Sequence, residues 1–445
     1  MEIAMKSQEM IDLCRRHTLY TWAATDQVAP LPIARAEGVY MYDPDGNRYL
    51  DFNSQLMSVH IGHAHPKVVQ AIKDQAERLI YVWPGSATEP RARLAQRLAD
   101  LVPGDIDTFF FTLGGAEANE NAIKVARQYT GRHKILARYR SYHGATHACM
   151  QLTGDPRRLP NEPGLPGVVH VMDPWPYDYS FGASPEEITR NHLTYLEEVI
   201  QYEGVEQIAA LFIETVTGTN GILVPPPGWL EGVRDLTERH GILLVCDEVM
   251  CGFGRTGKMF AFEHAGIVPD LVTMAKGLTS SYVPLGAVGM RQPVADHFRD
   301  HVFWGGLTYN SHALACATAL AVLDVIVEED LVGNAERLGA VMREEMARLA
   351  ERHPSVRATR NIGLFGVVEL GDSDGKPLVP YRGSHPAMKE LNAAFRAGGL
   401  FTLVWGGTFF TNPPLIITEA QLREGFAILD EALLVTDRAI GAAPV

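Results

Sequence analysis

The sequence predicts an α/β fold in which a large domain, with a mainly parallel sheet flanked by helices, is joined to a smaller α+β domain. Two observations support this. Short apolar strands alternate with helix-like stretches up to about residue 320, which is typical of a parallel sheet. After residue 325 the pattern changes to a long charged helix, a strand and a further helix. The 445 residues are enough for both parts, and we expect the large domain at 61–325 and the small one at 1–60 and 326–445.

The individual elements are predicted in order along the chain. Residues 39–52 alternate around a D-G turn at Asp45–Gly46 and predict a β-hairpin. The periodicity then predicts strands at 106–112, 209–214, 241–248, 271–277 and 284–290, and helices at 116–131, 313–327 and 333–353. A strand at 363–370 and a helix after Ile417 follow. The Pro- and Gly-rich stretch from about 154 to 186 is expected to be a long loop that serves a site.

Composition excludes several classes of function. The formal net charge of −14 disfavours a nucleic acid or an anionic membrane as partner. The start of the sequence has no signal-peptide pattern, and the apolar stretch 313–327 is alanine-rich and contains Asp324, which suits a buried helix. Five scattered cysteines without C-x-x-C indicate reduced thiols. We therefore expect a cytoplasmic protein without a metal, membrane or nucleic-acid partner.

The stretch VCDEVMCGFGRTGK (245–258) contains G-x-G-x-x-G, which raises the possibility of a dinucleotide site. In such a site the first glycine follows a strand directly, the glycines open a helix, and an acidic residue stands about 20 positions further on. Here the apolar run ends at Cys246, Asp247 and Glu248 stand between it and Gly252, and no second strand ends in an acid at that distance. We interpret the glycines as a turn.

Three apolar strands end in a polar side chain, at Glu214, Asp247 and Lys276. Ligands of open α/β sheets bind at the carboxyl ends of the strands. A lone lysine or aspartate there is commonly a residue returning to solvent or a helix cap. Asp247 and Lys276, one strand unit apart, together suit pyridoxal phosphate, which needs a lysine amine for its aldehyde and a carboxylate for its ring nitrogen.

A phosphate site is expected at TLGGAEANENAIKVAR (112–127), where Gly114 and Gly115 follow a strand and open a helix. Free N–H groups and the helix dipole favour a dianion there, although an ordinary strand-to-helix turn would have the same pattern. Tyr142 could lie against a cofactor ring or fill the core.

Five ordered motifs resemble the class III aminotransferases, a fold-type-I group that includes the ω-transaminases. They are GGAEANENAIKVAR, SYHGAT, DEVMCGFGRTGK, PDLVTMAKGLTSSYVPLGAV and TYNSHALACATAL. DPDGNRYLDF is similar to the N-terminal hairpin of the family and NPPLIIT to its C-terminal strand, so nearly the whole chain is covered. The resemblance implies a seven-stranded-type sheet, a Schiff base between Lys276 and pyridoxal 5'-phosphate, and an ion pair between Asp247 and the pyridine nitrogen.

The resemblance also implies roles for other residues. Val249 would pack under the ring and Tyr142 over it, beside His143, with Glu214 near the cofactor. Thr308 would reach the phosphate of the other subunit's cofactor, which implies a homodimer or a tetramer built from such dimers. The residues implied to hold the phosphate are Gly114, Gly115 and Ala116.

The sequence departs from the family at several positions. Gly114 stands where serine is common, Ser280 and Ser281 replace a glycine pair, and Thr215 replaces a proline. Ornithine- and γ-aminobutyrate-type members have a glutamate at the position of Thr219 and an arginine at the position of Phe410. Because both halves of that pair are missing, those two substrates are disfavoured.

We expect a transaminase that moves the amino group of a primary amine or ω-amino acid to a 2-oxo acid. Residues 152–174 resemble taurine- and β-alanine-type members, where Arg157 or Arg158 could bind a sulfonate or carboxylate, or form a solvated loop pair. Trp22 and Trp83 could wall the pocket or fill the core. An apolar wall of Phe409 and Phe410 favours pyruvate over 2-oxoglutarate, unless an arginine such as Arg382 approaches.

Other functions of the same fold stay open. They are a simple-amine transaminase, an aminomutase and a dialkylglycine-type decarboxylase. A non-catalytic regulator that senses pyridoxal phosphate is disfavoured, because it would need a basic DNA-binding extension.

Overall fold

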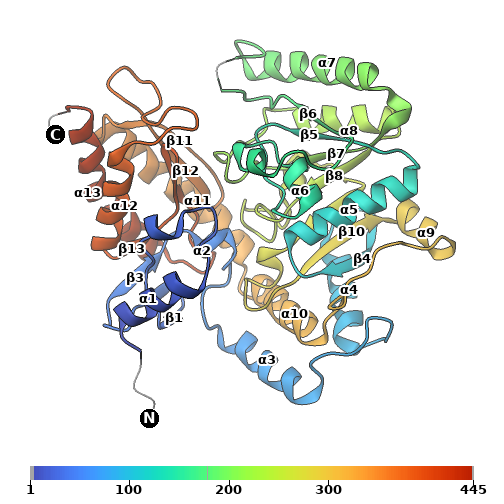
Figure 1. The fold of residues 1–445 in the computed structure, drawn as a ribbon, viewed down its shortest axis with the longest axis horizontal. Helices are drawn as coiled ribbons and strands as arrows, with labels where there is room; N and C mark the ends of the chain where they lie inside the picture. The colour runs from blue at the N-terminus through green and yellow to red at the C-terminus, as the bar shows by residue number, and fades with distance from the viewer. Residues whose placement is uncertain (1–4, 178, 443–445) are drawn as a thin grey trace.

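The computed structural model describes residues 5–177 and 179–442. Its larger lobe is built on a seven-stranded sheet of order β4-β10-β9-β8-β7-β5-β6 (Figure 1). The strands from β9 to β6 are parallel, and β10 is antiparallel to both of its neighbours, so the predicted mainly parallel sheet is confirmed. The strands are β4 (Ile106–Thr112), β5 (Lys134–Arg138), β6 (Val168–Val171), β7 (Ile208–Glu214), β8 (Leu243–Asp247), β9 (Leu271–Met274) and β10 (Gly286–Arg291).

Helices cover both faces of this sheet. Every residue of β7 and β8 is buried, as expected for central strands with both faces covered. Helix α5 packs across β7, β9 and β10, whereas α10, the alanine-rich helix, packs against α3 and α4. The helices are α3 (Pro66–Arg78), α4 (Glu89–Leu101), α5 (Gly115–Thr130), α6 (His147–Leu152), α7 (Pro185–Glu203), α8 (Trp229–Arg239), α9 (Gln292–Asp300) and α10 (Ala313–Glu328).

The smaller lobe contains segments from both ends of the chain (Figure 1). The predicted hairpin is present as β2 and β3, and β13 pairs in parallel with β3, Leu400 beside Leu50. A second sheet has the order β11-β12-β15-β14. The strands are β1 (Arg35–Glu37), β2 (Tyr40–Tyr42), β3 (Arg48–Asp51), β11 (Val356–Ile362), β12 (Phe365–Leu370), β13 (Leu400–Phe401), β14 (Val404–Trp405) and β15 (Thr408–Thr411). The helices are α1 (Ser7–His17), α2 (Ser54–Met57), α11 (Leu331–Arg352), α12 (Pro386–Ala397) and α13 (Glu419–Ala439).

The stretch from about 154 to 186 differs from the expected continuous loop. It contains a 3₁₀ helix at Pro156–Asn161 and the edge strand β6, which pairs in parallel with β5. The run VVHV is short, and its pairing depends on the neighbouring strand and not on its own periodicity. The domain boundaries at 60 and 325 stay a prediction.

The glycines of the G-x-G-x-x-G pattern shape turns, as interpreted from the sequence. No helix follows β8 directly. Gly254 and Gly257 have φ of +90° and +86°, backbone conformations that residues with a side chain rarely adopt. The five cysteines carry free thiols. Within residues 5–177 and 179–442, no helix has the length and apolar character needed to cross a bilayer.

Candidate active site

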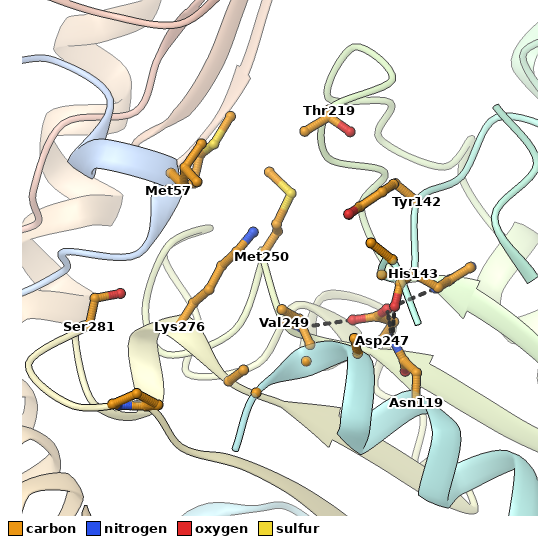
Figure 2. Close-up of a pocket in the computed structure, with 18 of the residues that line it drawn as sticks. Met57, Asn119, Tyr142, His143, Thr219, Asp247, Val249, Met250, Lys276 and Ser281 are labelled. Carbon is orange, nitrogen blue, oxygen red and sulfur yellow. Dashed lines mark hydrogen bonds and ion pairs between the residues drawn. The ribbon is translucent and has the colours of Figure 1, made fainter. Parts of the chain in front are cut away.

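The register of the sheet brings the predicted polar strand ends together. Glu214 of β7 is paired with Asp247 of β8, and Asp247 is paired with Thr273 of β9. Lys276 follows β9 by two residues and has φ of +46°, a backbone conformation that non-glycine residues rarely adopt and that is often found at functional sites. Glu214, Asp247 and Lys276 line one cavity of about 540 Å³ between the two lobes. Figure 2 shows Asp247 and Lys276 at this cavity.

Lys276 is partly buried, and its amine points into this cavity (Figure 2). Removal of the ammonium from bulk water lowers the pKa of Lys276 to about 8, although the nearby carboxylates of Asp247 and Glu214 act in the opposite direction. A substantial fraction of the side chain is therefore the neutral, nucleophilic amine at a pH slightly above neutral.

Asp247 is oriented by a buried hydrogen-bond network. Its Oδ2 atom accepts from Nδ2 of Asn119 and from Nδ1 of His143, each at 2.8 Å, while Oδ1 accepts from the backbone N–H of Val249 at 3.0 Å. Asn119 Oδ1 in turn accepts from Thr273 Oγ1 at 2.8 Å. No sequence pattern points to Asn119 or Thr273 as site residues. This network fixes the plane of a carboxylate that is 4% exposed.

The start of α5 forms another wall of the cavity. Gly114, Gly115 and Ala116 line it, and the first N–H groups of a helix have no partner inside the helix. At Gly115 a Cβ atom would lie 2.8 Å from the side chain of Val249, so this close approach requires glycine. A sixteen-residue helix that begins at a cavity is a favourable place for a phosphate dianion.

Tyr142, His143, Glu214 and Val249 also line the cavity. The Glu214 carboxylate accepts from the backbone N–H of Tyr142 at 2.9 Å and of Gly218 at 2.8 Å, and burial raises the pKa of this side chain. Burial likewise raises the pKa of the Tyr142 phenol, so it stays neutral. Glu214 therefore fixes the backbone on two sides of the cavity.

Arg157 is the arginine that the structure places in the cavity, together with Trp22. Its guanidinium pairs with Asp155, donates from Nη2 to Thr219 Oγ1 at 2.7 Å, and lies 3.8 Å from the centre of the Tyr142 ring. The rings of Trp22 and Trp405 lie 5.4 and 5.3 Å away. Among the residues described, Nη1 of Arg157 has no hydrogen-bond partner. Its N–H groups are therefore available to bind an anion.

The remaining predicted site residues lie outside the cavity of their own chain. Arg158 pairs with Glu162, Trp83 is 74% exposed, and Thr308 is exposed. Phe410 and Phe409 are fully buried in the core, so the expected apolar wall is not formed by them. Both faces of β15 are covered, which leaves neither phenylalanine free to reach the cavity. Leu403 and Trp405 line it instead.

The residues present fit pyridoxal phosphate. The glycine cradle and helix start suit its phosphate, Asp247 suits its protonated ring nitrogen, and Lys276 suits its aldehyde. These features come from three strand ends and one helix start, and all of them face the same cavity.

Comparisons with known proteins agree with this fit. A family model described as "Aminotransferase class-III" matches residues 21–433. A taurine:2-oxoglutarate aminotransferase from Bifidobacterium kashiwanohense, solved with PLP and glutamate, is 39% identical, with a TM-score of 0.94 over 99% of this chain and 100% of that one. An (S)-enantioselective ω-transaminase from Thermomicrobium roseum is 38% identical, with a TM-score of 0.92 over 97% and 99%. A putrescine–pyruvate aminotransferase from Pseudomonas aeruginosa is 31% identical over 92% and 91%.

Proposed function

This chain belongs to the class III aminotransferases, which depend on pyridoxal phosphate, and we propose that it moves the amino group of an ω-amino acid to a 2-oxo acid. The observation that carries the proposal is one cavity that contains a lysine, a fixed carboxylate, a helix start and a partly paired arginine. Lys276 and Asp247 are the proposed catalytic residues.

The proposed role of Lys276 is proton transfer inside the cavity. When bound, pyridoxal phosphate supplies an aldehyde that receives the amino group and a cationic ring that withdraws electrons from the substrate carbon. The Lys276 amine would accept a proton at Nζ from that carbon and hold it away from bulk water. Its lowered pKa suits this role, because proton transfer is most efficient when the pKa of the base lies near the working pH.

The proposed role of Asp247 is to hold a proton on the ring nitrogen. Two donors fix its Oδ2 atom, so the carboxylate cannot rotate away from the cavity. An ionised acid in contact with a pyridine nitrogen favours the cationic form of that ring. In this account Gly114, Gly115 and Ala116 bind the phosphate and Tyr142 and Val249 contact the ring.

For the donor we propose an ω-amino acid that ends in a sulfonate or carboxylate. The support is the unpartnered Nη1 of Arg157 in the cavity, since a guanidinium binds both oxyanions through paired hydrogen bonds. The Bifidobacterium structure, whose name includes taurine, is also similar over the whole chain. Arg158 has its own partner in Glu162, so Arg157 is the better candidate.

For the acceptor we favour pyruvate. Arg157 is the arginine that lines the cavity in the part of the chain described, and a dicarboxylate such as 2-oxoglutarate needs a second cationic anchor. The names of the relatives include both acceptors, so the family does not decide the choice. We expect the ratio of kcat/KM for pyruvate over 2-oxoglutarate to exceed one with a fixed donor. A ratio well below one would contradict this choice.

We also propose a homodimer in which Thr308 contributes to the partner's cofactor site. Thr308 does not line the cavity of its own chain, and its carbonyl accepts from the Tyr81 hydroxyl at 2.7 Å. The rings of Tyr81 and of Tyr309, the next residue in the chain, lie 5.9 Å apart, and both are exposed. Exposed aromatic residues in one region are typical of a subunit interface.

A simple-amine transaminase is the second candidate. Much of the cavity wall is apolar, with Leu56, Met57, Val283 and Leu403. A donor screen with pyruvate decides between the two. We expect taurine or β-alanine to have a higher kcat/KM than propylamine, which replaces the anionic end with a methyl group. The opposite order would favour the simple-amine reading, and no reaction with any amine would contradict transamination.

A further inference from the structure

A turn at residues 218–222 lies between the cavity and the small lobe. The backbone N–H groups of Gly221 and Ile222 both donate to the carbonyl of Gly218, at 3.0 and 2.9 Å. Gly221 and Ile222 have φ of +116° and +46°. The second value is unfavourable for a β-branched residue, so contacts from outside the turn are needed to maintain this conformation.

This turn holds both members of the ion pair at the cavity wall. Thr219 Oγ1 accepts from Arg157 Nη2 at 2.7 Å, and Asn220 Nδ2 donates to Asp155 Oδ2 at 3.1 Å. Figure 2 shows Thr219 on its loop at the edge of the cavity, on the same side as Tyr142. Any displacement of the turn would therefore change the direction in which the guanidinium of Arg157 presents its free donors.

Two other arginines hold the turn from its far side. Arg360, on β11 of the small lobe, donates from Nε to the carbonyls of Gly221 and Ile222 at 2.7 and 3.1 Å, and its Nη2 pairs with Glu369 of β12. Arg140, which follows β5 of the large sheet, donates from Nη2 to the Asn220 carbonyl at 2.9 Å. Arg360 does not line the cavity.

We propose that Arg360 is a positioning residue for substrate specificity: by fixing the turn at 218–222 it orients Arg157 toward the anionic end of the substrate. The inference rests on the proposed function, in which Arg157 binds that anion. A guanidinium recognises an oxyanion through directed hydrogen bonds, so a small change in its orientation weakens the contact. In the described part of the chain, residues 219–222 make no hydrogen bond to Lys276, near which the amine end of the substrate would bind.

The test compares two arginines of the same strand. Arg360→Ala removes the donors to the turn, whereas Arg357→Ala is the matched control. Arg357 pairs with the same Glu369 at 3.5 Å but donates to the carbonyl of Gly375 and not to the turn. The holoenzymes are assayed with the better of taurine and β-alanine and, separately, with propylamine. Binding of propane-1-sulfonate, an anion without an amine, is measured by calorimetry.

We expect Arg360→Ala to raise KM for the ω-amino acid, and the dissociation constant of propane-1-sulfonate, about tenfold, with kcat within about twofold. KM and kcat for propylamine should change less than about twofold, and Arg357→Ala should leave all of these values nearly unchanged. The KM effect on one donor class separates positioning from a general loss of structure.

The inference would be overturned if Arg360→Ala left both KM for the ω-amino acid and the dissociation constant of propane-1-sulfonate unchanged. It would also be overturned if KM for propylamine rose by the same factor. If Arg360→Ala does not fold, Arg360→Lys is used, because it keeps the charge beside Glu369 but lacks the guanidinium fork; the same rise in the two constants is then required. Failure of the proposed function can be distinguished from failure of this inference, because it would appear already in the wild-type enzyme as no reaction with an anionic donor.

Discussion

Asn119 shows how the orientation of Asp247 depends on a single neighbouring side chain. Its amide connects Asp247 Oδ2, the carbonyl of His143 and the hydroxyl of Thr273 within hydrogen-bond distance. A buried carboxylate with fixed partners keeps one orientation, and loss of one partner leaves several polar groups unpaired.

We predict that Asn119→Ala lowers kcat/KM about tenfold or more and weakens pyridoxal phosphate binding, because a buried unpaired polar group costs about 1–3 kcal/mol. Asn121→Ala is the control, since Asn121 lies on the same helix, is equally buried and donates to the carbonyl of Glu117 instead. Steady-state rates and cofactor titration check the prediction. Equal effects of the two substitutions would show that Asn119 has no specific link to Asp247.

The burial of Lys276 reduces the stability of the folded apoprotein at neutral pH. Its pKa is about 8 in the folded apoprotein, below the ordinary value of a lysine, so between these values the unfolded chain binds more protons than the folded one. The free energy of unfolding therefore rises with pH across this window. Below pH 8 the folded state carries the full penalty of the charged amine.

We predict that Lys276→Met increases the free energy of unfolding of the apoprotein at pH 7 by up to about 3 kcal/mol. The difference in free energy of unfolding between the variant and the wild type should decrease as the pH rises above 8. Denaturant unfolding of both apoproteins at pH 7 and pH 9.5 measures this difference. A difference that grows with pH, or a variant that is less stable than the wild type at pH 7, would contradict the lowered pKa of Lys276.

At the scale of elements, the sequence predicts those strands whose apolar runs end in a functional side chain, such as β7, β8 and β9. Each of them is buried on both faces, so hydrophobicity alone identifies it. Strand β6 was missed because its four residues stand in a Pro- and Gly-rich stretch and pair only through β5. Asn119 was missed because nothing in a helical sequence shows that one residue faces the end of a strand.

The predicted position of Phe410 on the wall of the cavity is wrong for a related reason. A motif position indicates where a residue stands in the chain, whereas the packing of β15 decides which way the side chain points. Arg157 could be identified as a candidate from the sequence, but its preference over Arg158 depends on their partners in the folded chain.

The segment that replaces the family's glycine pair provides a test at this scale. Ser280 and Ser281 have φ of +48° and +60°, the left-handed region that favours glycine. Ser281 is exposed, so Ser281→Gly should increase the free energy of unfolding by about 0.5–1 kcal/mol. Ser280 Oγ accepts from the N–H of Ile61 at 3.0 Å, so Ser280→Gly should decrease it by about 1 kcal/mol. Urea unfolding checks both, and a destabilised Ser281→Gly variant would contradict the strain argument.

At the scale of the whole molecule, the proposed dimer makes the cofactor site a joint product of two chains. Thr308→Ala should therefore weaken pyridoxal phosphate binding about tenfold, as expected for the loss of a hydrogen bond to a charged group, without changing the mass of the particle in solution. Light scattering and cofactor titration measure the two effects. A monomeric wild-type enzyme with full cofactor affinity would exclude this arrangement.

Lys276 is the residue on which the proposed aminotransferase reaction depends. The most direct test is the visible absorbance of the holoprotein during sequential addition of an amine and a 2-oxo acid. We expect the amine to remove the visible band and pyruvate to restore it in the wild type, whereas the Lys276→Ala variant should fold but not complete the cycle. A visible band that does not respond to any amine in the wild type would rule out transamination, and a Lys276→Ala variant that cycles at the wild-type rate would rule out the role of Lys276.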